Sequence, residues 1–284
     1  MSWNVGGAGS RAFLRALKLL TNQHKPDILI LLEPQISGTT ADLVCEKLGY
    51  PDIARVDANG RSGGIWLCWD KKAFDVEITS ACFQHLTAKI TSANLSSFLL
   101  TAIYASPNYQ LQPSLWNSLI TFSSTISLPW LLTGDFNAFR SLNEKSGLAT
   151  TSTARRCRIF NNFIDQANLI DLGFSGPRFT WSRGDTASNY KASRIDRSLC
   201  NSTWNECFPN STVIHLPRMQ SDHSPILTSI GGRSPTNSPS RPFRFEASWL
   251  AHDDFASFLT GTWDDGSPLH TALQAFADHL KEWS

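Results

Sequence analysis

The sequence of 284 residues contains no long apolar run and opens without a basic region followed by an apolar core. Its longest clean apolar stretches, such as residues 28–32, have the length of a strand. They are far shorter than the roughly 18 residues of a membrane-spanning helix, so a membrane protein is excluded. Because the N-terminus does not resemble a secretory signal and no targeting signal is recognised, we expect an intracellular protein.

The six cysteines include no CxxC pair, and no histidine lies at zinc-finger spacing from two of them. The usual zinc modules are therefore excluded. Cys45 and Cys68 lie among apolar neighbours and are predicted to be small buried hydrophobes. Without a secretory signal, we expect a reducing compartment in which the thiols remain free.

Charged side chains are scarce, at 17% of the chain against about 25% in a typical soluble protein. The 25 lysines and arginines nearly balance 24 acidic residues, so the total charge does not indicate a polyanionic partner. Ten tryptophans and 17 phenylalanines supply too much apolar surface for a disordered chain. Residues 153–197, however, hold eight cations and four acids, an excess that either faces phosphates or belongs to a solvated helix and loop.

Apolar periodicity predicts an α/β protein with one large core. Helix-like segments alternate with apolar strand-like runs in the first half, and short strands dominate thereafter, an order that favours a layered sandwich of mixed sheets. Predicted helices cover residues 10–24, with Ser10 as the cap, and residues 41–48, 113–125 and 154–169. Predicted strands cover residues 28–32, 63–69, 74–79, 86–90, 98–105, 129–133, 178–182, 193–199, 212–216 and 225–230.

The composition changes after residue 230. Residues 231–242 are rich in Gly, Ser, Pro, Asn and Arg and are predicted to form a linker. Residues 243–284 are predicted to form a distinct helical unit, and its last helix, over residues 269–283, carries an apolar stripe that nothing later in the sequence covers. The members of this stripe are Leu269, Ala272, Leu273, Phe276, Leu280 and Trp283.

Eight polar side chains lie at the ends of predicted strands, where loops can bring them to a common site. Carboxylates are the ligands that Mg²⁺ prefers, and one can also take a proton from an attacking water. Hydrogen-bond donors stabilise a charged phosphoryl group, and a histidine held by a carboxylate has a fixed tautomer and a raised pKa. These residue types suit phosphodiester hydrolysis. They are Asn4, Glu33, Tyr104, Asp135, Asn137, Asp196, Asp222 and His223.

Taken one at a time, these residues also have simpler interpretations. Asp135 and Asn137 belong to a Gly-Asp-Phe-Asn segment with the composition of an ordinary turn. Glu33 precedes a proline and suits a loop, while Asp222 and His223 could cap the strand that follows. Only the order and spacing of the whole set favour the functional interpretation.

That set resembles the exonuclease–endonuclease–phosphatase superfamily, which includes deoxyribonuclease I and the apurinic/apyrimidinic endonucleases. The motifs that carry the resemblance are Trp3-Asn4, Glu33, Tyr104-Ala105-Ser106-Pro107, Gly134-Asp135-Phe136-Asn137, Arg194-Ile195-Asp196-Arg197 and Ser221-Asp222-His223. The chain is most similar to the endonuclease domain of plant LINE-type (non-LTR) retrotransposon proteins. This similarity shows in Phe179-Thr180-Trp181-Ser182 and in residues 171–176 and 243–250.

The resemblance implies a four-layer α/β sandwich over residues 1–230, with two mixed sheets packed face to face, helices outside them, and a helical C-terminal appendage. It also implies a Mg²⁺-dependent DNA endonuclease, with Mn²⁺ as an alternative ion, that leaves a 3′-OH as in target-primed retrotransposition. A longer form would continue into a reverse transcriptase, and the implied location is the nucleus. The oligomeric state does not follow from the sequence.

The same resemblance implies individual roles. Glu33 binds Mg²⁺, with Asn4 beside it and Asp222 near the metal, and Asp135 orients and activates the water. Asn137 and Tyr104 contact the scissile phosphate, and His223 pairs with Asp196 to stabilise phosphoryl charge. Thr180 matches a position that contacts DNA in the retrotransposon branch.

Three arginines gather at the start of the predicted helix over residues 154–169, where they oppose the helix dipole. We expect Arg155, Arg156 and Arg158 to contact the DNA backbone, against the alternative of a solvated helix end.

The sequence also departs from the family pattern. Only Met1 and Ser2 precede the Trp-Asn pair, so the first strand is expected to be short and its edge of the sheet weakened. Gly6 and Gly7 stand where a basic residue is common. Two alternatives remain open, an inactive nucleic-acid-binding relic of a truncated element and a phosphoesterase acting on a small phosphate substrate.

Overall fold

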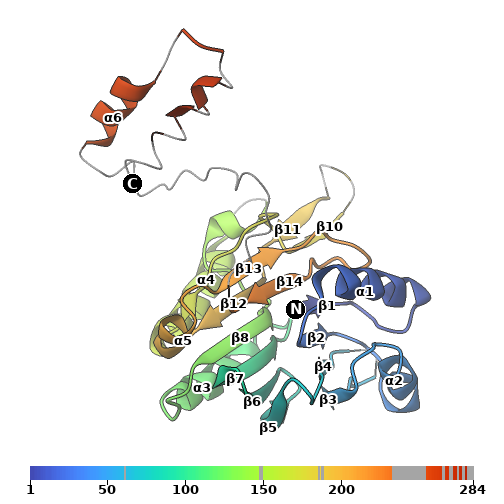
Figure 1. The fold of residues 1–284 in the computed structure, drawn as a ribbon. Coiled ribbons are helices and arrows are strands. Elements are labelled where there is room, and N and C mark those ends of the chain that lie inside the picture. Colours follow the sequence, from blue (N-terminus) through green and yellow to red (C-terminus); the bar gives the residue numbers. More distant parts are fainter. Residues whose placement is uncertain are drawn as a thin grey trace. The chain divides into compact units, whose positions relative to one another are not determined.

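The computed structural model describes residues 1–60, 62–146, 150–184, 186, 189–231, 254–263, 266–268, 271–273, 275–276 and 279. The chain divides into two compact units, Met1–Arg233 and Ser234–Ser284. The first unit is built on two six-stranded sheets (Figure 1). Among the described residues, no helix combines the length and the apolar character needed to span a membrane.

The first sheet places the N-terminal strand at its centre. Its strand order is β13 (Thr212–His215), β14 (Ile226–Ser229), β1 (Ser2–Asn4), β2 (Leu29–Leu32), β4 (Ile65–Trp69) and β3 (Asp52–Val56). Only β1 and β2 run parallel, and Asn4 pairs with Leu32 at their carboxyl ends. We expected the short first strand to weaken an edge of the sheet, but this was wrong, because β1 has β14 on one side and β2 on the other.

The second sheet repeats this arrangement with one parallel pair. Its order is β5 (Asp75–Cys82), β6 (His85–Ser92), β7 (Leu95–Tyr104), β8 (Trp130–Asp135), β12 (Asp196–Cys200) and β9 (Ile170–Asp171). Strands β7 and β8 are parallel, so Tyr104 pairs with Asp135, and the antiparallel β12 pairs Asp196 with the same residue. Three polar residues therefore lie side by side at one end of the sheet. A separate ribbon consists of β10 (Trp181–Arg183) and β11 (Lys191–Ser193).

Helices cover the outer face of each sheet. Helices α1 (Arg11–His24) and α2 (Gly38–Cys45) pack on the first sheet, and α3 (Gln112–Ser123) and α4 (Thr151–Gln166) pack on the second. The inner faces share one apolar core. The predicted four-layer sandwich of mixed sheets is thus confirmed. The short helices η1 (Leu142–Glu144) and α5 (Ser202–Cys207) complete the unit.

Local sequence explains why these elements form where they do. The Ser10 side chain accepts a hydrogen bond from the Phe13 amide and caps α1, and Phe13 and Leu17 are buried on the sheet side. Trp116 of α3 stacks on Phe163 of α4 with ring centroids 4.7 Å apart, which joins the two helices over the second sheet. The apolar residues whose periodicity predicts these helices are therefore the ones that pack against the sheets.

The structure adds elements that the periodicity does not predict. Strand β3 is only half-buried, β9 has two residues, and α5 spans six, so none of them carries a long apolar pattern. The prediction of a buried Cys68 is confirmed, whereas Cys45 is only half-buried because it lies at the end of α2.

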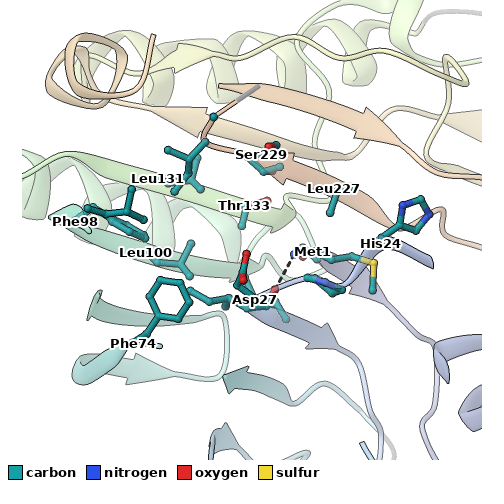
Figure 2. A pocket seen from close by; sticks show the side chains of 18 of the residues that line it. Met1, His24, Asp27, Phe74, Phe98, Leu100, Leu131, Thr133, Leu227 and Ser229 are labelled. Atoms are coloured by element: carbon teal, nitrogen blue, oxygen red, sulfur yellow. Dashed lines mark hydrogen bonds between the residues drawn. The ribbon is translucent and has the colours of Figure 1, made fainter. Parts of the chain in front are cut away.

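A largely apolar cavity of about 430 Å³ lies between the sheets at the end where β1 begins (Figure 2). Phe98, Leu100 and Leu131 of the second sheet line it. The Met1 amino group donates to the Ile28 carbonyl over 2.8 Å, and burial lowers the pKa of that amino group to about 5. Asn4, by contrast, lies at the far end of β1.

The described part of the second unit contains α6 (Phe255–Thr262). Phe276, a member of the predicted apolar stripe, packs against Phe258 and Trp263, with ring centroids 5.9 Å away in both cases. The stripe is therefore covered in part within its own unit, while Leu273 is 50% exposed. Leu269, Leu280 and Trp283, like residues 232–250 of the predicted linker and its continuation, lie outside the described residues.

Candidate active site

The eight polar residues predicted from strand ends occupy the same end of both sheets. Asn4 ends β1, Glu33 follows β2, Tyr104 ends β7, and Asp135 ends β8. Asn137 follows β8, Asp196 begins β12, and the loop between β13 and β14 supplies Asp222 and His223. Because the parallel pairs β1–β2 and β7–β8 end at this edge, residues distant in sequence meet there (Figure 1).

The side chain of Asp135 has no exposed surface and accepts three hydrogen bonds. Its Oδ2 accepts hydrogen bonds from the Asn4 side-chain amide over 3.0 Å and from the Asn137 side-chain amide over 3.1 Å. Its Oδ1 accepts from the Asn137 backbone amide over 2.8 Å. Three donors therefore fix the orientation of this carboxylate.

His223 lies between two buried carboxylates. Its Nδ1 is 2.9 Å from Asp196 Oδ2, and its Nε2 is 3.8 Å from Asp135 Oδ2. The Asp196 bond places a proton on Nδ1 and directs Nε2 toward Asp135. This is the His–Asp pair that the sequence resemblance implies for these two residues.

The electrostatics of the three groups depend on one another. Burial, followed by the neighbouring Asp196 carboxylate, raises the pKa of Asp135, while His223 opposes the shift. Burial alone would lower the pKa of His223, but the Asp196 and Asp135 carboxylates outweigh it and raise the pKa well above the ordinary value. The two carboxylates thus favour the protonated form of His223, and burial makes Asp135 a stronger proton acceptor than an ordinary aspartate.

Glu33, which follows β2, has a strained backbone and contacts Tyr104. Glu33 Oε1 accepts a hydrogen bond from the Tyr104 hydroxyl, and Gln35 Nε2 lies 3.5 Å from Glu33 Oε2. Glu33 has φ +52° and Gln35 has φ +56°, values that residues other than glycine adopt rarely. Such outliers concentrate at functional sites, where the surroundings hold them in place. Burial, reinforced by Glu33, raises the pKa of Tyr104, so its hydroxyl remains a donor.

Asp222 is exposed and is oriented by the Trp181 indole N–H, which donates to its Oδ2 over 3.0 Å. A two-glycine turn lies between Asp222 and Glu33. A Cβ at Gly6 would lie 3.9 Å from Asp222 Oδ1, and the Gly7 amide donates to the Glu33 carbonyl over 2.8 Å. Both glycines have positive φ, +56° and +119°, so the turn brings the two segments together without a side chain between them.

Two sets of residues could serve a metal ion. Asp135, Asp196 and His223 place ligand atoms within 4.8 Å of one another and could hold one. Asp196 Oδ2, however, is already paired with His223 Nδ1. Glu33 and Asp222 are more accessible carboxylates, which suits a hard cation that keeps several waters.

The three predicted DNA-binding arginines separate in the structure. Arg156 is half-buried, donates to the Asn137 carbonyl over 3.1 Å, and lies 5.5 Å above the Phe139 ring. Arg155 and Arg158 are exposed. Arg156 therefore supports the loop that carries Asn137, and only the other two face solvent freely.

Thr180, also predicted to contact DNA, is 1% exposed. Its hydroxyl oxygen accepts from the amides of Ile195 and Asp196 over 3.1 and 3.0 Å. This side chain fixes the start of β12 and hence the Asp196 carboxylate, so any contact with DNA remains a prediction.

Several supporting residues were not assigned roles from the sequence. Ser221 donates to the Asn4 carbonyl over 2.8 Å and accepts from the His223 amide over 3.1 Å, which joins β1 to the histidine loop. The Trp3 indole donates to the His223 carbonyl over 3.1 Å. Both residues fall within the motifs quoted above, but only the folded chain reveals what they hold.

Residues 1–223 match the Endonuclease/Exonuclease/phosphatase family. The chain belongs to that family. No curated protein shows significant sequence similarity to it.

Solved structures of several nucleases have a similar fold. The AP endonuclease LMAP from Leishmania major has a TM-score of 0.62 at 18% identity, over 79% of this chain and 85% of that chain. The endonuclease domain of TRAS1, a telomere-specific non-LTR retrotransposon, has a TM-score of 0.59 at 14% identity, over 81% and 96%. The 3′-5′ exonuclease NExo from Neisseria meningitidis has a TM-score of 0.57 at 17% identity, over 81% and 98%.

Proposed function

We propose that the chain is a Mg²⁺-dependent DNA endonuclease that hydrolyses one phosphodiester bond and leaves a 3′-OH, with Mn²⁺ as an alternative ion. The observation that carries the proposal is the arrangement around Asp135. The buried Asp135 carboxylate is oriented by Asn4 and Asn137, lies 3.8 Å from His223 Nε2, and has its pKa raised by burial. This places a base beside a cationic group, as hydrolysis of an anionic ester requires.

The site residues would divide the chemistry as follows. Asp135 takes a proton from the water that attacks phosphorus, and the bond from phosphorus to the 3′ oxygen breaks. Asn137 and Tyr104 contact the phosphoryl oxygens, and to donate there each exchanges a hydrogen bond that it makes in this structure. For Asn137 that bond is one of those to Asp135 and Ala105, and for Tyr104 it is the bond to Glu33. His223, held by Asp196, stabilises the charge that develops there.

Glu33 and Asp222 would hold the metal ion, with Asn4 beside them. When bound, the ion would polarise the phosphoryl group and stabilise the departing oxygen. The support is their accessibility and the Gly6–Gly7 turn that links their segments. The strained backbone of Glu33 is expected where a ligand fixes a side chain.

The TRAS1 neighbour and the sequence motifs favour a retroelement endonuclease that acts on DNA, and its location in the nucleus is implied by the sequence resemblance alone. In this proposal residues 1–230 are the nuclease, residues 231–242 a linker, and residues 243–284 the segment before a reverse transcriptase in a longer form. Arg155 and Arg158 would contact the DNA backbone from the exposed side of α4.

A plasmid-nicking assay tests the proposal. Purified protein should convert supercoiled plasmid to the open circle in Mg²⁺, EDTA should stop the reaction, and renewed Mg²⁺ should restore it. The nick should serve directly as a primer for a DNA polymerase, because it carries a 3′-OH. Absence of nicking in both Mg²⁺ and Mn²⁺, or nicking that persists in EDTA, would refute the proposal.

The same samples separate the alternatives. Binding of DNA without cleavage in either metal would indicate the inactive relic. Release of inorganic phosphate from small phosphate monoesters without nicking would indicate a phosphoesterase. The NExo structure described as a 3′ phosphatase bound to product DNA hairpin makes a DNA 3′-phosphate a useful third substrate.

A further inference from the structure

A second feature of the first unit lies directly beside the candidate active site. It is an open groove of about 290 Å³, and Thr180 and Ser224 contribute to its lining. Ser224 follows His223 in sequence, and its amide donates to the Thr180 carbonyl over 2.6 Å. Trp181, next to Thr180, forms a β-bridge with His223. The groove is therefore continuous with the strand and loop that position the histidine.

The walls of the groove are cationic. The Nη1 of Arg218 donates to the Ser182 carbonyl over 2.7 Å and to its hydroxyl over 2.6 Å. Arg178 lies 5.2 Å above the ring of Phe179, and its Nη2 donates to the Asn143 carbonyl. Backbone oxygens thus hold both guanidinium groups, and each retains further N–H groups for a ligand. None of the described residues that line the groove is acidic.

Aromatic surface lies in the same groove. Tyr190 lines it and is 48% exposed, and the Phe179 ring is half-buried under Arg178. An exposed aromatic ring beside two guanidinium groups matches the chemistry of a nucleotide, because nucleobases stack on aromatic rings and phosphates pair with arginine. The volume lies below the roughly 300–1,000 Å³ of typical small-molecule sites, which suits one nucleotide of a longer strand.

We propose that this groove binds a nucleotide of the substrate strand that flanks the scissile phosphate. Arg218 and Arg178 contact its phosphate, and Tyr190 stacks on its base. The inference rests on the proposed nuclease function and deepens it, since it assigns three residues to substrate binding that the motif series does not include.

Binding measurements in EDTA test the groove separately from catalysis. The probe is a fluorescently labelled oligonucleotide, used as a single strand and as a duplex, and affinity is read by anisotropy over a range of salt concentrations. Arg218→Gln should weaken binding. Arg218→Gln combined with Arg178→Gln should reduce the slope of log affinity against log salt by about 0.7–0.9, the value for one phosphate contact. Tyr190→Ala should weaken binding by about five- to 150-fold, as expected for one stacked base, with the slope unchanged.

Two further variants control for indirect effects. Tyr190→Phe keeps the ring and should bind as the wild type does. Arg15→Gln removes an exposed arginine on α1 and should change neither affinity nor nicking. Equal affinity of Arg218→Gln, Tyr190→Ala and Arg15→Gln for the probe would overturn the groove assignment, as would equal loss for Tyr190→Phe and Tyr190→Ala. Failure of the nuclease proposal would show instead as DNA binding without cleavage in Mg²⁺.

Discussion

His223 Nδ1 lies 2.9 Å from Asp196 Oδ2, and both side chains are buried. Because the aspartate acts through the imidazole, the two residues should contribute as one unit. We expect His223→Ala to lower the rate of nicking by about a hundred- to thousand-fold, the scale of one lost transition-state donor. Asp196→Asn should also slow the reaction, and the double variant should be no slower than His223→Ala. Rate losses that multiply in the double variant would contradict a shared role.

The pH dependence of nicking should report the same cluster. The raised pKa of Asp135 predicts that the rate rises with pH above the usual carboxylate range, as this base loses its proton. The raised pKa of His223 predicts a loss of rate only in alkaline solution, when the cation is neutralised. Asp196→Asn removes a negative charge that favours the imidazolium, so the alkaline limb should move to lower pH. The pH profile of kcat/KM, measured for the wild type and for Asp196→Asn, checks this shift. An alkaline limb that does not move would show that His223 is not the group whose titration causes it.

The arginines of α4 should divide into two classes. Neutralising Arg155, Arg156 and Arg158 together should flatten the dependence of log affinity on log salt by up to about 1.8, because only Arg155 and Arg158 are exposed and each is expected to contact one phosphate. Because Arg156 donates to the Asn137 carbonyl, Arg156→Gln alone should also slow nicking at saturating DNA. Arg155→Gln with Arg158→Gln should affect only binding. An unchanged salt slope in the triple variant would favour the solvated helix end.

Removal of the C-terminal unit should leave the nuclease active. Residues 234–284 form a compact unit of their own, and the described aromatic cluster of Phe255, Phe258, Trp263 and Phe276 lies within it. A chain that ends at Ile230 should therefore nick plasmid at the full-length rate, and it should be more soluble because the apolar helix is gone. Loss of folding or of activity in this truncation would show that the nuclease core needs the tail.

Much of the fold could be predicted from sequence, because its long helices and buried strands carry clear capping residues and apolar periodicity. The helix that Ser10 caps and the buried strand ending at Leu32 both follow local rules of capping and periodicity. Strand β3 could not be found in this way, since its pairing with β4, rather than an apolar pattern, defines it.

For the candidate site, the sequence predicts which residues gather but not what each of them contacts. Strand ends and motif order indicate the eight polar residues, and all of them come to one edge of the sandwich. What each one contacts depends on how two sheets meet, and no local pattern encodes that. The burial of Thr180, the role of Ser221 and the separation of Arg156 from Arg155 all follow from packing between distant segments.

The central claim is metal-dependent hydrolysis at this edge, and Glu33→Ala tests it most directly. Nicking by this variant should be measured across a range of Mg²⁺ concentrations, with circular dichroism and thermal unfolding to check the fold. Glu77→Ala on β5, which removes an exposed glutamate elsewhere, serves as the matched control. We predict that Glu33→Ala remains folded but does not nick DNA in Mg²⁺, while Glu77→Ala nicks at the wild-type rate. Cleavage by Glu33→Ala at the wild-type rate would contradict the account.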